Sequence, residues 1–329
     1  MRDKLFAISQ TGVSHLLADT ERYFSPCQDS YKIVDFPGED IPDWNGSLHG
    51  TIIAVADGHG NPVYHGSSEF GSKLAVEAAT ECMLELVTDY EKTKDVEIFW
   101  GFPKMVTTAW RMRVLEHAKG RFPEKDLRKR FSKEQAYEDY LERIYMDYGS
   151  TLLVTVVLPE EKLLIAAQIG DGDILMMYHS DPKGEVHRLA DENPRREFGS
   201  NVTDSLCMYR ADERFQMEIL DGKESSKDAE ILEDFVLLVA TDGISSGALS
   251  EMHYLDGYCK RRMENYMLAE RQSGRHFMSR YIENEMEKEM RFYSTDDMTV
   301  VFMAVNDRDD EEGEDGKSKE LAEKLGLEW

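Results

Sequence analysis

Short runs of apolar and β-branched residues, each bounded by turn residues, recur along the chain and predict β-strands. The runs cover residues 5–8, 31–34, 51–56, 151–158, 162–169, 174–178, 235–241 and 299–305. Residues 159–161 read Pro-Glu-Glu and residues 170–173 read Gly-Asp-Gly-Asp, so both segments have the residue types of hairpin turns. We therefore expect several of these strands to pair with their neighbours as antiparallel hairpins.

Longer segments between these runs carry apolar residues at helical spacing. They cover residues 67–87, 104–118, 121–147 and 249–292, and the last two are rich in charged residues. Helices thus come in blocks, and strands come as hairpins. This order favours an α+β fold with antiparallel sheets over a doubly wound parallel sheet.

Composition and charge exclude several classes of protein. The 329 residues include 65 acidic and 39 basic side chains, a net charge of -26, so a nucleic acid or an anionic membrane would be repelled as the main ligand. No apolar run approaches the roughly 20 residues of a membrane helix, and the N-terminus lacks the apolar core of a signal peptide. The four cysteines are scattered without a C-x-x-C pair. We expect a reduced, cytoplasmic protein without a disulfide framework.

Acidic residues stand at the ends of several predicted strands. The acids at these junctions are Asp57, Asp171 and Asp242, each followed by glycine, and Asp29 and Asp296, each just before a strand. Asp-Gly is also a common turn dipeptide, so a single junction has a structural explanation. As a set they are harder to explain in that way. Strands this apolar are buried, so their ends lie close together at one edge of the core.

Carboxylates gathered at such an edge repel one another, and a divalent cation removes that repulsion. Mg²⁺ and Mn²⁺ prefer oxygen ligands, and the lack of a His/Cys cluster argues against zinc. We therefore predict a two-metal site with Asp57, Gly58, Asp242 and Asp296 as ligands and with Asp29 and Asp171 nearby. Two metal ions that share a water suit phosphoryl chemistry. His59 is a candidate general acid, although a lone histidine is more often structural or a surface residue.

These junctions belong to a longer series of motifs. In chain order the motifs are Asp57-Gly-His-Gly60, Gly149-Ser-Thr151, Gly170-Asp-Gly172, Ala240-Thr-Asp-Gly243 and Asp296-Asp-Met-Thr299. The series resembles the type-2C protein phosphatases, which are metal-dependent serine/threonine phosphatases. Gly12-Val-Ser-His15 followed by Cys27-Gln-Asp-Ser30 resembles the opening motif of a bacterial branch of that family. The resemblance extends over nearly the whole chain before residue 306.

The resemblance implies a fold and a cofactor. The fold would be a sandwich of two antiparallel β-sheets flanked by helices, with two Mn²⁺ or Mg²⁺ ions in a cleft at one end. Asp57 would bridge both ions and Gly58 would offer its carbonyl to one, while Asp242 and Asp296 would complete the other. Asp29 would lie in or just outside the coordination shell.

The resemblance also implies an activity, which is hydrolysis of phosphoserine or phosphothreonine in phosphoprotein substrates, opposite a Ser/Thr kinase. The nucleophile would be a water that bridges the two metals. His59 matches the general acid of the family, and Asp171 would hold a weaker third ion. We expect one catalytic domain over residues 1–306, with helical insertions near 89–147 and 249–292. Residues 307–329 begin with a run of acids and are expected to form a flexible tail.

The sequence departs from the family pattern at several positions. Gln28 stands where many members have glutamate, Phe24 where many have a phosphate-binding arginine, and Asp173 adds an acid. Arg22 and His15 are then the candidates for contacting the phosphate. The departures leave open a second hypothesis, a non-catalytic regulatory module that binds phosphoproteins or partner proteins. A third is a fold relative that acts on small phosphate esters or a signalling anion.

Overall fold

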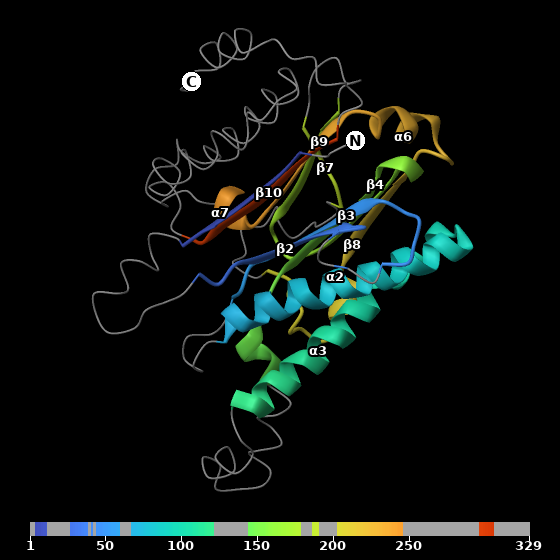
Figure 1. Cartoon of the computed structure of the whole chain (residues 1–329). Helices are drawn as coiled ribbons and strands as arrows, with labels where there is room; N and C mark the ends of the chain where they lie inside the picture. Colours follow the sequence, from blue (N-terminus) through green and yellow to red (C-terminus); the bar gives the residue numbers. More distant parts are fainter. Residues whose placement is uncertain are drawn as a thin grey trace, which may run out of the picture.

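The computed structural model describes residues 4–11, 27–38, 41, 44–59, 67–121, 144–178, 186–190, 203–245 and 296–305. In this part of the chain, strands form two five-stranded sheets that pack face to face (Figure 1). The first sheet has the order β1-β10-β9-β6-β7, and the second has the order β2-β3-β4-β5-β8. Every neighbouring pair is antiparallel. The predicted α+β class with two antiparallel sheets is confirmed.

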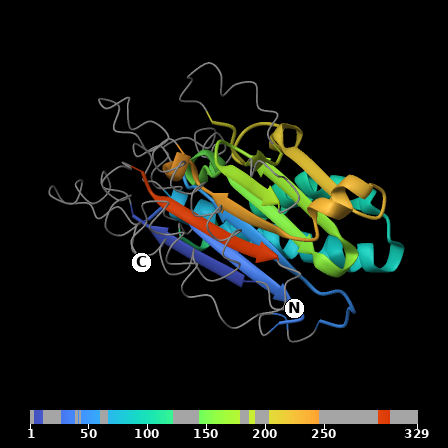
Figure 2. The ribbon, with the colours of Figure 1, turned by 90° about the horizontal axis from the view of Figure 1, so that it is seen from above.

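The predicted strands are all present, and their bounds differ from the prediction by a few residues. The first sheet contains β1 (Lys4–Gln10), β10 (Met298–Val305), β9 (Phe235–Ala240), β6 (Asp173–Tyr178) and β7 (His187–Arg188). The second contains β2 (Ser30–Phe36), β3 (Gly50–Ala56), β4 (Leu152–Leu158), β5 (Leu163–Ile169) and β8 (Gln216–Asp221). The sequence did not predict β7 and β8, which lie at the edges of the sheets. Strands β1 and β10, from opposite ends of the sequence, lie side by side (Figure 2).

The core explains why the apolar runs of the sequence are continuous. Every residue of β4, β5, β9 and β10 is buried. Between the sheets, Ile53 and Leu153 share a hydrophobic cluster with Leu237 and Val301. On the other face of the second sheet, residues such as Ile52 pack towards the helices. Strands covered on both faces have no solvent side, so they lack the alternation of apolar and polar residues.

Two long helices cover the second sheet. Helix α2 (Ser68–Thr93) lies across the sheet, and α3 (Phe102–Arg121) packs against α2 (Figure 1). The fully buried Trp110 of α3 donates its indole N–H to the carbonyl oxygen of Gly71 at 3.0 Å. A Cβ at Gly71 would lie 2.0 Å from the carbonyl oxygen of Tyr148, so this close approach requires glycine. The helices predicted over 67–87 and 104–118 are therefore present, and α2 continues beyond its predicted end.

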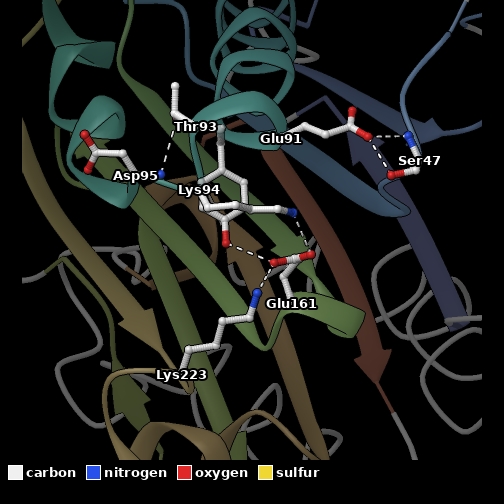
Figure 3. Close-up of polar contacts among 8 residues, drawn as sticks. Ser47, Glu91, Thr93, Lys94, Asp95, Glu161 and Lys223 are labelled. Carbon is white, nitrogen blue, oxygen red and sulfur yellow. Dashed lines mark hydrogen bonds and ion pairs between the residues drawn. The ribbon is translucent and has the colours of Figure 1, made fainter.

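The far end of α2 is tied to the turn between β4 and β5. This turn is the 3₁₀ helix η5 (Pro159–Glu161). The Glu161 carboxylate accepts hydrogen bonds from Lys94 Nζ at 2.9 Å and from the Tyr90 hydroxyl at 3.1 Å, and it pairs with Lys223 (Figure 3). One half-buried carboxylate thus joins three segments that are distant in sequence.

The remaining described helices are short. They are η3 (Val96–Gly101), η4 (Ile144–Tyr148), η7 (Ala211–Arg214), α6 (Ser226–Ile231) and α7 (Asp242–Ser245). The helices predicted over 121–147 and 249–292 and the tail at 307–329 lie largely or wholly outside the described residues, and η4 is the described end of the first of them. Among the described helices, none is both long and apolar enough to cross a membrane.

Candidate metal centre

Asp57 follows the last residue of β3, and its backbone is fixed against the start of β4. Its N–H donates to the Thr151 hydroxyl oxygen at 3.0 Å, and the Thr151 N–H donates to the Asp57 carbonyl oxygen at 2.9 Å. These two bonds hold Asp57 just beyond the end of the paired strands. Because the backbone of Asp57 is held in this way, its side chain starts from a defined position at the end of β3.

The two residues after Asp57 continue along the same segment. Gly58 forms an isolated bridge with Ser150, and the His59 N–H donates to the Gly149 carbonyl oxygen at 3.0 Å. A Cβ at Gly58 would lie 2.5 Å from the carbonyl oxygen of Ser68 and 2.6 Å from that of Gln28. Glycine is therefore required here because three backbone segments meet without room for a side chain.

Asp29 lies at the start of β2, next to the end of β3, because Ser30 pairs with Ala56. Its side chain is buried, and its Oδ2 accepts a hydrogen bond from the Thr241 hydroxyl at 2.8 Å. Its Oδ1 is buried and has no hydrogen-bond partner among the described residues. Burial, together with the charge of Asp297 and against the lowering effect of the Thr241 hydrogen bond, raises the pKa of Asp29 to about 7.

The first sheet supplies acids at the same end of the sandwich. Asp242 begins α7 just after β9, and Asp296 lies just before β10. Strands β9 and β10 pair with Ala240 opposite Val300, which places these two acids at one end of the pair. The Gln28 N–H donates to Asp297 Oδ2 at 2.6 Å and so joins this end of the first sheet to the second.

Three other carboxylates affect the pKa of Asp57. Burial raises the pKa of Asp57 well above its ordinary value, and the charges of Asp29, Asp242 and Asp296 each raise it further. The structure thus brings together four of the acids that the sequence singles out. They come from four strand ends that are far apart in the sequence, and they approach one another at one end of the sandwich.

His59 and Asp171 form the second part of the site. Asp171 lies in the turn between β5 and β6, where Gly170 has a φ of 109°. Burial lowers the pKa of His59, and the charge of Asp171 opposes that effect. The Nε2 atom of His59 is buried and has no hydrogen-bond partner among the described residues. Its ring is also close to Gly149, where a Cβ would lie 3.2 Å from the His59 Nδ1 atom.

The donor set fits a hard divalent cation. It consists of carboxylate oxygens, including the Oδ1 of Asp29, which has no hydrogen-bond partner among the described residues. Gly58, whose carbonyl is the further candidate ligand, directly follows Asp57 in the chain. Within the described residues, no three His, Cys, Asp or Glu side chains are arranged as a ready coordination shell. The negatively charged carboxylates repel one another, and a cation would have to draw them together. Arg22 and His15, the candidates for contacting phosphate, lie outside the described residues.

Sequence reasoning missed the groups that hold the acids in place. Thr241 bonds to Asp29, and its N–H donates to the Thr299 carbonyl oxygen at 3.0 Å. Asp297 was noticed only as the neighbour of Asp296, yet it is the more buried of the two. Its place directly before a buried strand was a usable signal. The added acid, Asp173, is buried and pairs with Arg188 of β7 at 2.5 Å, so a strand that was not predicted balances its charge.

Comparisons with known proteins gave one family match and several solved structures of low sequence identity. A family model described as Protein phosphatase 2C matches residues 20–291. Searching curated protein sequences gave no match. Solved structures that resemble the chain include a bacterial serine phosphatase (13% identity, 94% of this chain and 100% of that chain, TM-score 0.47). They also include the catalytic domain of the serine threonine protein phosphatase PstP with 2 manganese ions (15%, 93% and 99%, 0.48).

A third such structure is the serine/threonine phosphatase Stp1 from Staphylococcus aureus (13% identity, 93% of this chain and 96% of that chain, TM-score 0.47). At these identities the assignment depends on the family match, which spans most of the chain, and not on any one of these structures. The strand order and the acids at the strand ends are consistent with that match. The chain belongs to the protein phosphatase 2C family.

Proposed function

We propose that the protein is a metal-dependent phosphatase that hydrolyses phosphoserine and phosphothreonine in other proteins. The observation that carries the proposal is the approach of Asp29, Asp57, Asp242 and Asp296 at one end of the sandwich. Mutually repelling carboxylates lower the stability of a protein unless they serve a ligand of opposite charge. Membership of the protein phosphatase 2C family indicates that the ligand is a metal ion and that the reaction is phosphate hydrolysis.

Each residue of the site has a role in this proposal. Asp57, the Gly58 carbonyl, Asp242 and Asp296 would hold two Mn²⁺ or Mg²⁺ ions, with Asp29 at their margin. When bound, such ions supply positive charge for the phosphate and a water of lowered pKa. The two hydrogen bonds between Asp57 and Thr151 fix the backbone of Asp57 before any ion binds, so on binding only the side chain remains to be oriented.

His59 would donate a proton to the oxygen that leaves with the serine or threonine side chain. Its buried Nε2 has no hydrogen-bond partner in the described part of the chain, so none of those residues competes with a substrate oxygen for its proton. The Gly149 carbonyl holds the His59 backbone, and the charge of Asp171 favours the protonated ring. Asp171 is also the residue to which we assign a weaker third ion.

The experiment that tests the proposal is hydrolysis by the full chain in the presence of Mn²⁺. The substrates are p-nitrophenyl phosphate and a phosphoserine peptide, and folding is checked by circular dichroism. We expect metal-dependent release of phosphate from both substrates. Folded protein that releases no phosphate from either substrate with metal supplied would contradict the proposal.

A second candidate function is a regulatory module that binds phosphoproteins without cleaving them. Gln28 favours it, because this residue lies beside Asp29 and contributes no charge where many family members have glutamate. Calorimetric titration with a phosphopeptide separates the two candidates. Such a module would bind the peptide and show no metal-dependent cleavage, whereas the phosphatase would cleave it.

In either case, we infer that the physiological partner is a phosphoprotein modified by a Ser/Thr kinase.

A further inference from the structure

A pocket of about 300 Å³ opens beside Asp29, next to the edge strand β2 of the second sheet. It is lined by one residue of β1, the start of β2 and one face of α2: Ser9, Asp29, Ser30, Tyr31, Lys32, Lys73, Val76 and Glu77. In the described sheet, β2 is an edge strand. The Ser30 and Ser72 hydroxyl oxygens are 3.0 Å apart, so β2 and α2 touch next to the candidate metal centre. The pocket therefore begins at that centre and extends outward along the edge of β2.

Two lysines from different elements line this pocket. Lys32 lies on the same face of β2 as Ser30, because side chains alternate along a strand, and that face contacts α2. Lys73 follows Ser72 on the helix. In the described part of the chain, neither lysine has an ion-pair partner. Their charges are available to a ligand.

The two carboxylates in the lining have other partners. Glu77 Oε2 lies 3.8 Å from Arg113 of α3, which also pairs with Glu81. Asp29 belongs to the candidate metal centre, where a divalent cation would offset its charge. With the charge of Asp29 offset in this way, the pocket has two lysines and one remaining carboxylate, Glu77, which is close to Arg113. The lysines are conspicuous in a chain whose net charge is -26, since the overall field repels anions at long range.

From this arrangement we infer that the pocket is a substrate subsite that binds an acidic side chain close to the phosphorylated serine or threonine, with Lys32 and Lys73 as the recognising residues. The inference rests on the proposed function, because it takes the phosphorylated residue to lie at the Asp57 end of the sandwich. An extended substrate segment can lie along the exposed edge of a strand and place alternate side chains in pockets on either side. Among the described strands, none pairs with the outer edge of β2, and this edge offers such a path away from Asp29.

The binding test uses peptides that cannot be cleaved. Two fluorescein-labelled peptides carry a phosphonate in place of phosphoserine, and they differ only in having glutamate or glutamine at the flanking positions. Fluorescence anisotropy with the full chain and Mn²⁺ gives the ratio of the two dissociation constants. We expect tighter binding of the glutamate peptide, by about two- to fivefold for each lysine that engages it. Raising the salt concentration should reduce this preference.

Substitutions assign the preference to the pocket. Lys32→Gln and Lys73→Gln should each reduce the glutamate preference, and the double variant should remove it. Lys73→Glu should reverse it, because a like charge then faces the peptide. Lys104→Gln is the matched control, since Lys104 is an exposed lysine of α3 and does not line the pocket. It should retain the full preference.

The outcomes separate this inference from the proposed function. If the wild-type protein binds both peptides equally, or if the double variant keeps the preference, the subsite is wrong even when phosphopeptides are cleaved. If the preference is present and depends on both lysines while no phosphopeptide is cleaved, the subsite stands and the phosphatase activity fails. Cleavage rates of the matched phosphoserine peptides provide a second measurement, and their kcat/KM ratio should follow the binding ratio.

Discussion

Asp57 is the residue on which the candidate site depends most. Its pKa is raised by burial and then by three neighbouring carboxylates, so at neutral pH its charge opposes folding when no cation is present. The same charge is what a divalent ion would bind. A group that lowers stability in the free protein and serves a ligand in the bound one is typical of functional sites.

Replacing Asp57 with asparagine separates these two effects. We expect Asp57→Asn to abolish Mn²⁺ binding, measured by calorimetry, and to abolish phosphate release. In chelator-treated protein the same variant should unfold at a higher temperature, by roughly 2 °C for about 1 kcal/mol of relieved repulsion. Wild-type activity in the variant would contradict the bridging role of Asp57, and a large drop in the melting temperature would contradict the repulsion.

Thr151 positions Asp57 without being a proposed metal ligand. Thr151→Val removes the hydroxyl that accepts the Asp57 N–H and keeps the shape of the side chain. We expect the affinity for Mn²⁺ to fall by about 10- to 100-fold, the usual cost of losing a group that orients a ligand. Thr155→Val is the control, because the Thr155 hydroxyl is buried on β4 without a partner in the described residues. Equal affinities in the two variants would exclude a positioning role.

His59 is tested through the leaving group. His59→Ala should slow hydrolysis of alkyl phosphates, such as a phosphoserine peptide, by about 10²–10⁴-fold. The rate with p-nitrophenyl phosphate should fall far less, because nitrophenolate leaves without needing a proton. Measuring kcat for both substrates gives the comparison. Equal losses on the two substrates would show that His59 does not act as the acid.

At the scale of elements, Glu161 holds together three segments at the end of the sandwich away from the site. It joins the end of α2, the turn between β4 and β5, and Lys223 after β8 (Figure 3). Burial raises the pKa of Glu161, but the hydrogen bonds from Lys223, Lys94 and Tyr90 outweigh burial and lower it to about 2. A carboxyl group with a depressed pKa in the folded state stabilises the fold while it is ionised.

This cluster predicts a dependence of stability on pH. Glu161 adds stability at any pH above its unfolded pKa near 4.5, and that contribution is lost as the pH falls towards the folded value of about 2. Glu161→Gln should therefore reduce the free energy of unfolding at pH 7 by about 1–3 kcal/mol. The difference from wild type should shrink below pH 4.5. Urea unfolding across this range measures it.

Glu160→Gln is the matched control for that experiment. Glu160 is the adjacent residue on the same turn, its side chain is 65% exposed, and its ion-pair partner is His49. Exposed pairs of this kind contribute little to stability. If the two variants unfold at the same urea concentration at pH 7, the cluster around Glu161 does not hold these segments together.

The sequence predicted elements well where they are long and apolar. The runs at 152–158 and 235–240 are buried on both faces, so their composition alone marks them as strands. Strand β8 was not predicted from the sequence. It is half-buried along its whole length, and Gln216, Glu218 and Asp221 interrupt its apolar residues. Strand β7 has only two residues, His187 and Arg188. Short strands at sheet edges have too little apolar surface to form a recognisable pattern.

At the scale of the whole molecule, the order of the strands could not be predicted from local pattern. Strand β1 pairs with β10, and the Ser9 and Thr299 hydroxyl oxygens are 2.7 Å apart although 290 positions separate them in the sequence. Such pairing depends on the packing of the complete core. The site could be predicted in part, because an acid after a buried strand has a local signature. Its supporting residues, such as Thr241 and Thr151, could not, because their partners are fixed by the register between distant strands.

Metal binding at the Asp57 end of the sandwich can be tested directly by crystallography. Crystals of the full chain soaked in manganese would reveal bound ions through their anomalous scattering. We expect two strong peaks among Asp57, Asp242 and Asp296, next to the Gly58 carbonyl oxygen. A well-ordered crystal with no anomalous peak at this end, or with manganese bound only elsewhere, would contradict this expectation.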